Sequence, residues 1–121
     1  MQDVTKKKEV ETFLKDFKEK KKIWGVLFLG RDKNFKTLAL LELRPVDREG
    51  VLDNLTIEDY SQGPIPEDWY GSKEMWVFGK VLKGHEIYIK ITLGAEGSNT
   101  ICISFHTADH PMLYPLKHKS Q

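Results

Sequence analysis

Residues 85–93 (HEIYIKITL) alternate cleanly between apolar and polar side chains. A period of two is that of a β-strand, in which successive side chains point to opposite faces of a sheet. The segment therefore predicts a strand with one face in the core and one polar face. The two faces are Ile87, Ile89, Ile91 and Leu93 against Tyr88, Lys90 and Thr92.

Residues 100–106 (TICISFH) repeat this alternation after a turn that contains glycine and serine. The pattern predicts a core face and a polar face, namely Ile101, Ile103 and Phe105 against Cys102, Ser104 and His106. A short connection joins consecutive strands into an antiparallel hairpin. Pairing of the two strands then places four polar residues on one face of one sheet: Tyr88, Lys90, Ser104 and His106.

The rest of the chain places helices before most of the sheet. Val4–Lys20 has apolar residues at spacings of three and four, which predicts an amphipathic helix. Further helices are predicted at 34–43 and 46–55, further strands at 23–29 and 75–81, and a long loop at 61–73.

This order indicates an α+β fold, with the N-terminal helices packed on one face of a twisted antiparallel sheet. The length of 121 residues suits a single domain over residues 1–121. Within it we expect a lysine-rich N-terminal helix at 1–22 and a flexible tail at 116–121.

Charge and cysteine content exclude several classes of protein. The formal net charge is +1, which is not the strongly basic balance typical of a nucleic-acid-binding domain. Cys102 is the only cysteine, so an intramolecular disulfide and a multi-cysteine zinc site are excluded. Because the sequence has neither a run of about 18 apolar residues nor an apolar leader, we expect a cytoplasmic protein that does not bind membranes.

The sequence also lacks the usual metal and cofactor motifs. His106 and His110 are four residues apart, but Pro111 disfavours the helix that would direct both at one metal ion. There is no HExxH or CxxC motif, phosphate-binding glycine loop or Gly-x-Ser-x-Gly elbow. We therefore expect no metal and no cofactor.

Tyr88, Lys90 and His106 form a set that could cleave RNA without a metal. That reaction needs a base for the 2′-hydroxyl proton, a cation for the charge that develops on the phosphate, and an acid for the leaving oxygen. Histidine exchanges protons near neutral pH, and lysine and tyrosine supply a positive charge and a proton donor. The alternative is an ordinary solvated sheet face, on which such residues are common.

The strand at 75–81 leaves two alternatives open. Trp76, Phe78 and Lys80 share one side of it. If that side lies beside Tyr88, the two aromatic rings can stack on unpaired bases. If it lies under the helices, they belong to the core.

A family resemblance rests on three segments taken in order: LTIEDYSQGP (55–64), MWVFGKVLKGHEIYIKITL (75–93) and ICISFHTADHPMLYP (101–115). Their order and spacing are similar to those of the MqsR-like toxins of bacterial type II toxin–antitoxin systems, which have the RelE-like ribonuclease fold. The resemblance implies a sequence-selective mRNA endoribonuclease that a cognate antitoxin encoded beside it holds inactive. Binding to operator DNA is then expected only through the antitoxin.

The resemblance also implies roles for single residues. The catalytic tyrosine of the family falls on Tyr88, and the basic residue that closes its last strand falls on His106, where the best-known members have lysine. A functional lysine falls on Gln62, so Lys90, Lys80 or Lys73 is expected to supply that charge. The predicted substrate contacts are Gln62, Trp76, Lys80 and Ser104. The alternative is a non-catalytic domain on the same scaffold, which binds an antitoxin or an operator.

Overall fold

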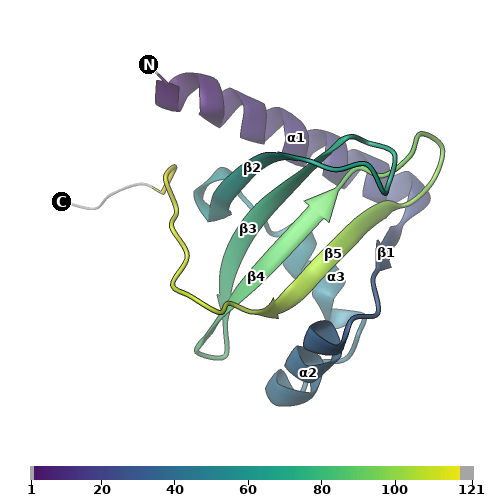
Figure 1. Cartoon of the computed structure of the whole chain (residues 1–121), viewed down its shortest axis with the longest axis vertical. Coiled ribbons are helices and arrows are strands. Elements are labelled where there is room, and N and C mark those ends of the chain that lie inside the picture. Colours follow the sequence, from purple (N-terminus) through teal and green to yellow (C-terminus); the bar gives the residue numbers. More distant parts are fainter. Residues whose placement is uncertain (1, 118–121) are drawn as a thin grey trace.

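The computed structural model describes residues 2–117 and has the predicted α+β composition (Figure 1). Three helices and a short 3₁₀ turn accompany a five-stranded sheet. The elements are α1 (Gln2–Trp24), β1 (Val26–Phe28), α2 (Asp32–Leu41), α3 (Asp47–Asp53), the 3₁₀ turn (Ile57–Asp59), β2 (Tyr60–Pro66), β3 (Glu74–Leu82), β4 (His85–Thr92) and β5 (Thr100–Thr107). No helix within residues 2–117 combines the length and the apolar character needed to cross a membrane.

The sheet is mixed, which corrects the prediction of an antiparallel sheet. Its strand order is β1-β5-β4-β3-β2. The neighbours from β2 to β5 are antiparallel, but β1 pairs parallel to β5. A parallel pair needs a long connection, and here the chain from α2 to β4 supplies it.

One face of the sheet is covered by α1 and α3, which lie behind it in Figure 1. The apolar stripe of α1 is buried, as its spacing predicts, and it packs on side chains of β3 and β4. The Phe13 ring lies 5.0 Å from the Trp76 ring and 6.2 Å from the Phe78 ring, measured between centroids. The core therefore lies between α1 and this face, which we call the helix face.

The predicted strand at 23–29 is shorter in the structure. Ile23 and Trp24 belong to α1, which ends at Trp24, and the strand comprises only Val26–Phe28. Gly25 has a φ of +77°, a left-handed conformation that glycine adopts without strain and that ends a helix. Helix α2 begins and ends two residues before the prediction, and its end coincides with the left-handed backbone of Glu42.

The predicted loop at 61–73 is wrong over its first half, where β2 pairs with β3. The two prolines of this segment, Pro64 and Pro66, disfavoured a strand because proline has no N–H to donate. They are tolerated because β2 is an edge strand and its register shifts twice, on either side of Gln62.

A β-bulge in β5 changes which of its residues face the core. Lys90 pairs with Ser104 but Ile91 pairs with Cys102, so Ile103 is the extra residue. Cys102 consequently belongs to the helix-face core at 1% exposure, and Ile103 lies beside Lys90 in a hollow on the other face. Ile101 pairs with Thr92, on the polar side of β4. The predicted inward positions of Ile101 and Ile103 and the outward position of Cys102 are therefore wrong.

The chain after β5 turns back along the face opposite the helices, which we call the open face. The Met112 N–H and the Tyr114 hydroxyl both donate to the Glu86 carboxylate, at 3.0 and 2.5 Å. A Cβ at Gly79 would approach Met112 Sδ to 2.9 Å, so a glycine is needed where this segment crosses β3. Of the predicted tail at 116–121, residues 118–121 lie outside the described part, and Leu116 packs against the core.

Candidate active site

Four predicted polar residues do share the open face. Tyr88 is paired with His106, and Lys90 with Ser104. The Tyr88 and His106 rings stack, with centroids 5.3 Å apart and planes inclined by 14°. Lys90 Nζ lies 5.8 Å from the centroid of the Tyr88 ring. The alternation of the two strands past the bulge thus places a histidine, a tyrosine and a lysine in the same part of the open face.

The orientation of the His106 ring is fixed by its neighbour. Nδ1 lies 2.9 Å from the carbonyl oxygen of Thr107. A carbonyl can only accept a hydrogen bond, so Nδ1 carries the hydrogen in this contact. In the neutral ring Nε2 is then an acceptor without a hydrogen, which is the form that a general base requires.

Side chains of α2 hold the outer edge of β5 around His106. The buried Asn34 donates through Nδ2 to the carbonyls of Leu29 and Ile103, at 2.9 and 3.2 Å, and its Oδ1 accepts the Phe105 N–H at 2.9 Å. Thr37 Oγ1 accepts the Thr107 N–H at 3.0 Å. Because β1 pairs only with the first part of β5, these side chains replace the missing strand on both sides of His106.

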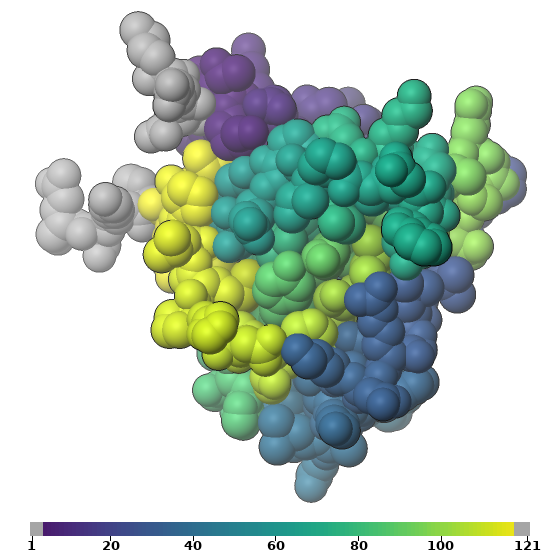
Figure 2. Space-filling model, in the orientation of Figure 1, coloured from purple at the N-terminus to yellow at the C-terminus, as the bar shows by residue number. Residues whose placement is uncertain are grey.

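These residues lie in a groove of about 720 Å³, which we call the open-face groove. Figure 2 shows the green strands β4 and β5 recessed between the yellow C-terminal segment, the teal chain of β2 and the blue chain near α2. The groove is lined by Arg31, Lys33, Ser61, Gln62, Tyr88, Lys90, Ser104, His106 and residues 108–113. Gln62 and Ser104, two of the four predicted substrate contacts, are therefore in the groove.

Arg31 is a groove residue that the sequence pattern did not indicate. It precedes α2, just after the strand that pairs with β5, and so reaches the groove from the side. Burial lowers the pKa of Lys90, and the positive charge of Arg31 lowers it further. Two cations thus share the groove. The third, Lys33, is bound to the Asp109 carboxylate at 3.0 Å.

Two predicted substrate contacts lie on the other face of the sheet. Trp76 is 6% exposed and packs on Phe13, and Lys80 Nζ lies 2.9 Å from an oxygen of Asp59. The inward isoleucines of β4 pair with Trp76, Phe78 and Lys80. Paired residues lie on the same face of a sheet, so these three side chains point toward the helix face. Of the two alternatives for this strand, the core position is correct, and neither Trp76 nor Lys80 can contact a substrate beside Tyr88.

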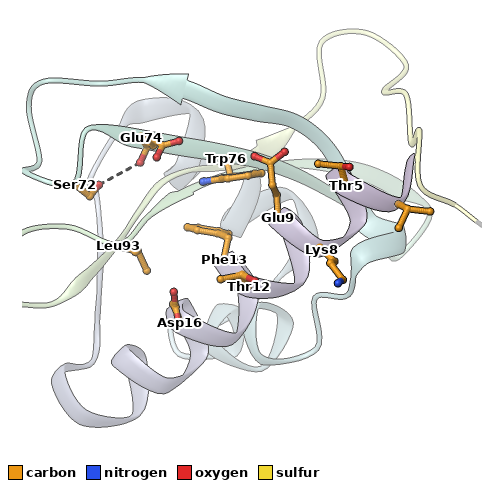
Figure 3. Close-up of a pocket in the computed structure, with 11 residues that line it drawn as sticks. Thr5, Lys8, Glu9, Thr12, Phe13, Asp16, Ser72, Glu74, Trp76 and Leu93 are labelled. Carbon is orange, nitrogen blue, oxygen red and sulfur yellow. Dashed lines mark hydrogen bonds between the residues drawn. The ribbon is translucent and has the colours of Figure 1, made fainter. Parts of the chain in front are cut away.

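A second hollow, of about 630 Å³, lies between α1 and the sheet (Figure 3). Three carboxylates line it, from Glu9, Asp16 and Glu74, together with the single cation Lys8. This acidic lining repels a phosphate, and its residues include no histidine. The open-face groove is therefore the better candidate for chemistry on a nucleic acid.

Cys102 is not available as a nucleophile. Burial raises the pKa of its thiol to about 12, and the nearby Arg48 only partly offsets this. The thiolate, which is the reactive form, is thus nearly absent at neutral pH. Among residues 2–117, no group of three or more His, Cys, Asp or Glu side chains is arranged to hold a metal ion.

Comparison with known proteins adds no relative. No protein-family model matches the chain, and no significant match is found among the curated proteins or the solved structures.

Proposed function

We propose that this protein is a RelE-like toxin of a type II toxin–antitoxin system, and that it cleaves mRNA without a metal ion. The observation that carries the proposal is the stack of His106 on Tyr88 in a groove that also contains Lys90 and Arg31. A base, a hydroxyl donor and two cations are the groups that cleavage of RNA through its own 2′-hydroxyl needs. The similarity of three segments to MqsR-like toxins supports the same function.

In the proposed reaction His106 is the base and Tyr88 the acid. Nε2 of His106 takes the proton of the 2′-hydroxyl, and that oxygen forms a bond to phosphorus while the bond from phosphorus to the 5′-oxygen breaks. The 5′-oxygen takes the Tyr88 hydroxyl proton, and proton exchange with water then returns the His106 imidazolium and the Tyr88 phenolate to their neutral forms. The products are a 2′,3′-cyclic phosphate and a 5′-hydroxyl. Burial raises the pKa of Tyr88, so its hydroxyl keeps its proton until it is needed.

Lys90 and Arg31 stabilise the negative charge on the phosphate. Burial and the positive charge of Arg31 both act against the Lys90 charge. The negative charge of a bound phosphate offsets both effects, and its attraction to a partly dehydrated ammonium is stronger than to a hydrated one. These two charges therefore favour binding of a phosphate in the groove that contains the Tyr88–His106 stack.

The proposed partners follow from the same resemblance. They are an mRNA substrate and a cognate antitoxin from the neighbouring gene, with operator DNA bound only through that antitoxin. The proposed place of action is the cytoplasm, where the mRNA is.

Induced expression tests the proposal in cells. We expect growth arrest, rescue by coexpression of the neighbouring gene product, and new RNA 5′ ends that carry a 5′-hydroxyl. Purified protein is expected to cleave single-stranded RNA in the presence of EDTA, or mRNA on ribosomes if cleavage depends on translation. Normal growth at high levels of folded protein, with no new RNA ends in either assay, would contradict the proposal.

Gln62 favours one second candidate, a non-catalytic domain on this scaffold. It lines the groove as a neutral amide where the resemblance implies a lysine. Such a domain binds the neighbouring gene product with or without its operator but produces no RNA ends. Cleavage that disappears in His106→Ala excludes it.

A further inference from the structure

Trp69 is the most exposed large apolar side chain among the described residues, at 88%. It belongs to the loop at 67–73, between β2 and β3. Burial of an indole ring is strongly favourable, which is why tryptophan is characteristic of cores and binding sites. A tryptophan exposed to water lacks this stabilisation. A mobile loop tip would explain such exposure without a ligand. An ordered loop, in contrast, indicates that the exposed ring is available as a binding surface.

The loop is closed around a buried carboxylate. Glu67 is 6% exposed and accepts hydrogen bonds from the Tyr70 N–H at 2.8 Å and from Ser72 Oγ at 3.0 Å. The Glu67 N–H donates to the Lys73 carbonyl at 2.9 Å, which joins the two ends of the loop. Burial acts to raise the pKa of Glu67, but the hydrogen bonds from Tyr70 and Ser72 outweigh it and lower that pKa. The exposed Trp69 ring is therefore carried on an ordered support.

A hollow of about 580 Å³ lies between this loop and the open-face groove. Arg31 and Lys90 line both, so the two spaces meet at the cations that are proposed to hold the phosphate. The remaining lining combines aromatic rings, apolar side chains and two carboxylates: Pro66, Glu67, Asp68, Trp69, Tyr70, Met75 and Ile103.

This lining suits a base better than a second phosphate. The exposed Asp68 carboxylate repels an anion, whereas the Trp69 and Tyr70 rings offer flat apolar surfaces. Aromatic side chains beside a cationic track are how proteins bind single-stranded nucleic acid, since every base has a face that can stack. In a single-stranded RNA, each phosphate is bonded to sugars that carry bases. A phosphate bound at Arg31 and Lys90 therefore brings a base close to this hollow.

We propose that Trp69 is a stacking platform for a base of single-stranded RNA next to the scissile phosphate, with Arg31 and Lys90 at the junction of the two spaces. The subsite rests on the proposed function and deepens it, because it names the part of the substrate that the loop at 67–73 binds. Trp69 is a substrate-binding residue and takes no part in proton transfer.

The test compares Trp69→Ala and Trp69→Phe with Trp24→Ala. Trp24 is a second exposed tryptophan, at the end of α1, and it does not line either space. The probe is a fluorescent single-stranded oligonucleotide with a 2′-deoxy sugar at the cleavage position, which binds without being cut. We expect Trp69→Ala to weaken binding about 5- to 150-fold, the usual range for one base stacked on an aromatic ring. Trp69→Phe should retain most of the affinity, and Trp24→Ala all of it.

A scan with abasic nucleotides separates stacking from other effects. One abasic position is expected to weaken binding to the wild type but not to Trp69→Ala, because the same contact cannot be lost twice. On a cleavable RNA, Trp69→Ala should raise KM with little change in kcat, since the stack forms before the reaction and persists through it. Circular dichroism checks that each variant is folded.

The failures of the two proposals are distinguishable. If the wild type cleaves RNA and Trp69→Ala binds and cleaves with wild-type affinity, the subsite is wrong and the proposed function stands. If Trp69→Ala loses only its affinity for the neighbouring gene product, the loop is a protein-docking surface and the subsite is again wrong. If the wild type neither binds nor cleaves RNA, both proposals fall.

Discussion

The helix face and the open face are formed by the same strands but are used differently. Phe78, Ile87 and Ile89 on the helix face are completely buried under α1. Tyr88 and His106, next to them in the strands, are half-buried in a groove. Because side chains alternate across a sheet, the packed face fixes the strand register, and that register sets the neighbours on the other face. Stability and the proposed chemistry can therefore be changed separately, residue by residue.

The largest expected effect is on the helix face. Phe78→Ala should lower the free energy of unfolding by about 3–5 kcal/mol, the usual cost of removing a buried phenylalanine and leaving a cavity. Urea denaturation followed by circular dichroism measures it. The matched control is Val81→Ala on the same strand, which is 67% exposed and should change stability by less than about 0.5 kcal/mol. Equal losses in the two variants would contradict the assignment of the faces.

On the open face, Tyr88→Phe should slow RNA cleavage and leave the free energy of unfolding nearly unchanged. It removes only the hydroxyl, which makes no hydrogen bond to another side chain within residues 2–117, so stability should change by less than about 1 kcal/mol. The rate of RNA cleavage should fall about 100-fold or more, the usual scale for losing a general acid. Wild-type cleavage by this variant would exclude the hydroxyl from the reaction.

The buried carboxylate of Glu67 predicts a pH dependence at the border of the two faces. Its folded-state pKa lies below the ordinary value of 4.5, so its contribution to stability is complete above about 4.5 and is lost as the pH falls through the folded-state pKa. Thermal denaturation between pH 7 and 3 should show the loss in the wild type. Glu67→Gln should be less stable at pH 7 and less sensitive to acid. A wild type and a variant with parallel curves would contradict the role of the carboxylate.

The smallest expected effect is that of Lys80, which the sequence placed among the substrate contacts. Its ion pair with Asp59 is partly solvated, with the two side chains 30% and 16% exposed. Lys80→Met should therefore lower the free energy of unfolding by about 1 kcal/mol or less and leave the cleavage rate unchanged. Loss of cleavage with stability intact would mean that a substrate reaches the helix face.

The sequence predicted the neighbours of Tyr88 on the open face better than it predicted the edges of the sheet. The regular alternation of β4 places Tyr88 and Lys90 together, and this local signal is sufficient because their neighbours Ile87, Ile89 and Ile91 must be buried. The bulge at Ile103 has no comparable signal. It depends on how β5 meets β4 and on Asn34 of α2, which takes over the backbone groups of Ile103 and Phe105.

Arg31 and β2 were missed for a related reason. Arg31 reaches the groove only because β1 pairs parallel to β5, a contact between segments more than 70 residues apart in the chain. The prolines of β2 indicate a loop, because proline cannot donate a hydrogen bond within a sheet. They are compatible with a strand only at the edge of the sheet. Both features depend on the tertiary arrangement, so periodicity along the chain could not reveal them.

The most direct test of the central claim is the rate at which His106→Ala cleaves single-stranded RNA, compared with His110→Ala. Both histidines line the open-face groove, but only His106 stacks on Tyr88. We predict that His106→Ala is folded and cleaves about 100-fold or more slowly than the wild type, the usual cost of losing a general base. The exposed His110→Ala should cleave at nearly the wild-type rate. Cleavage by folded His106→Ala at the wild-type rate would contradict the account.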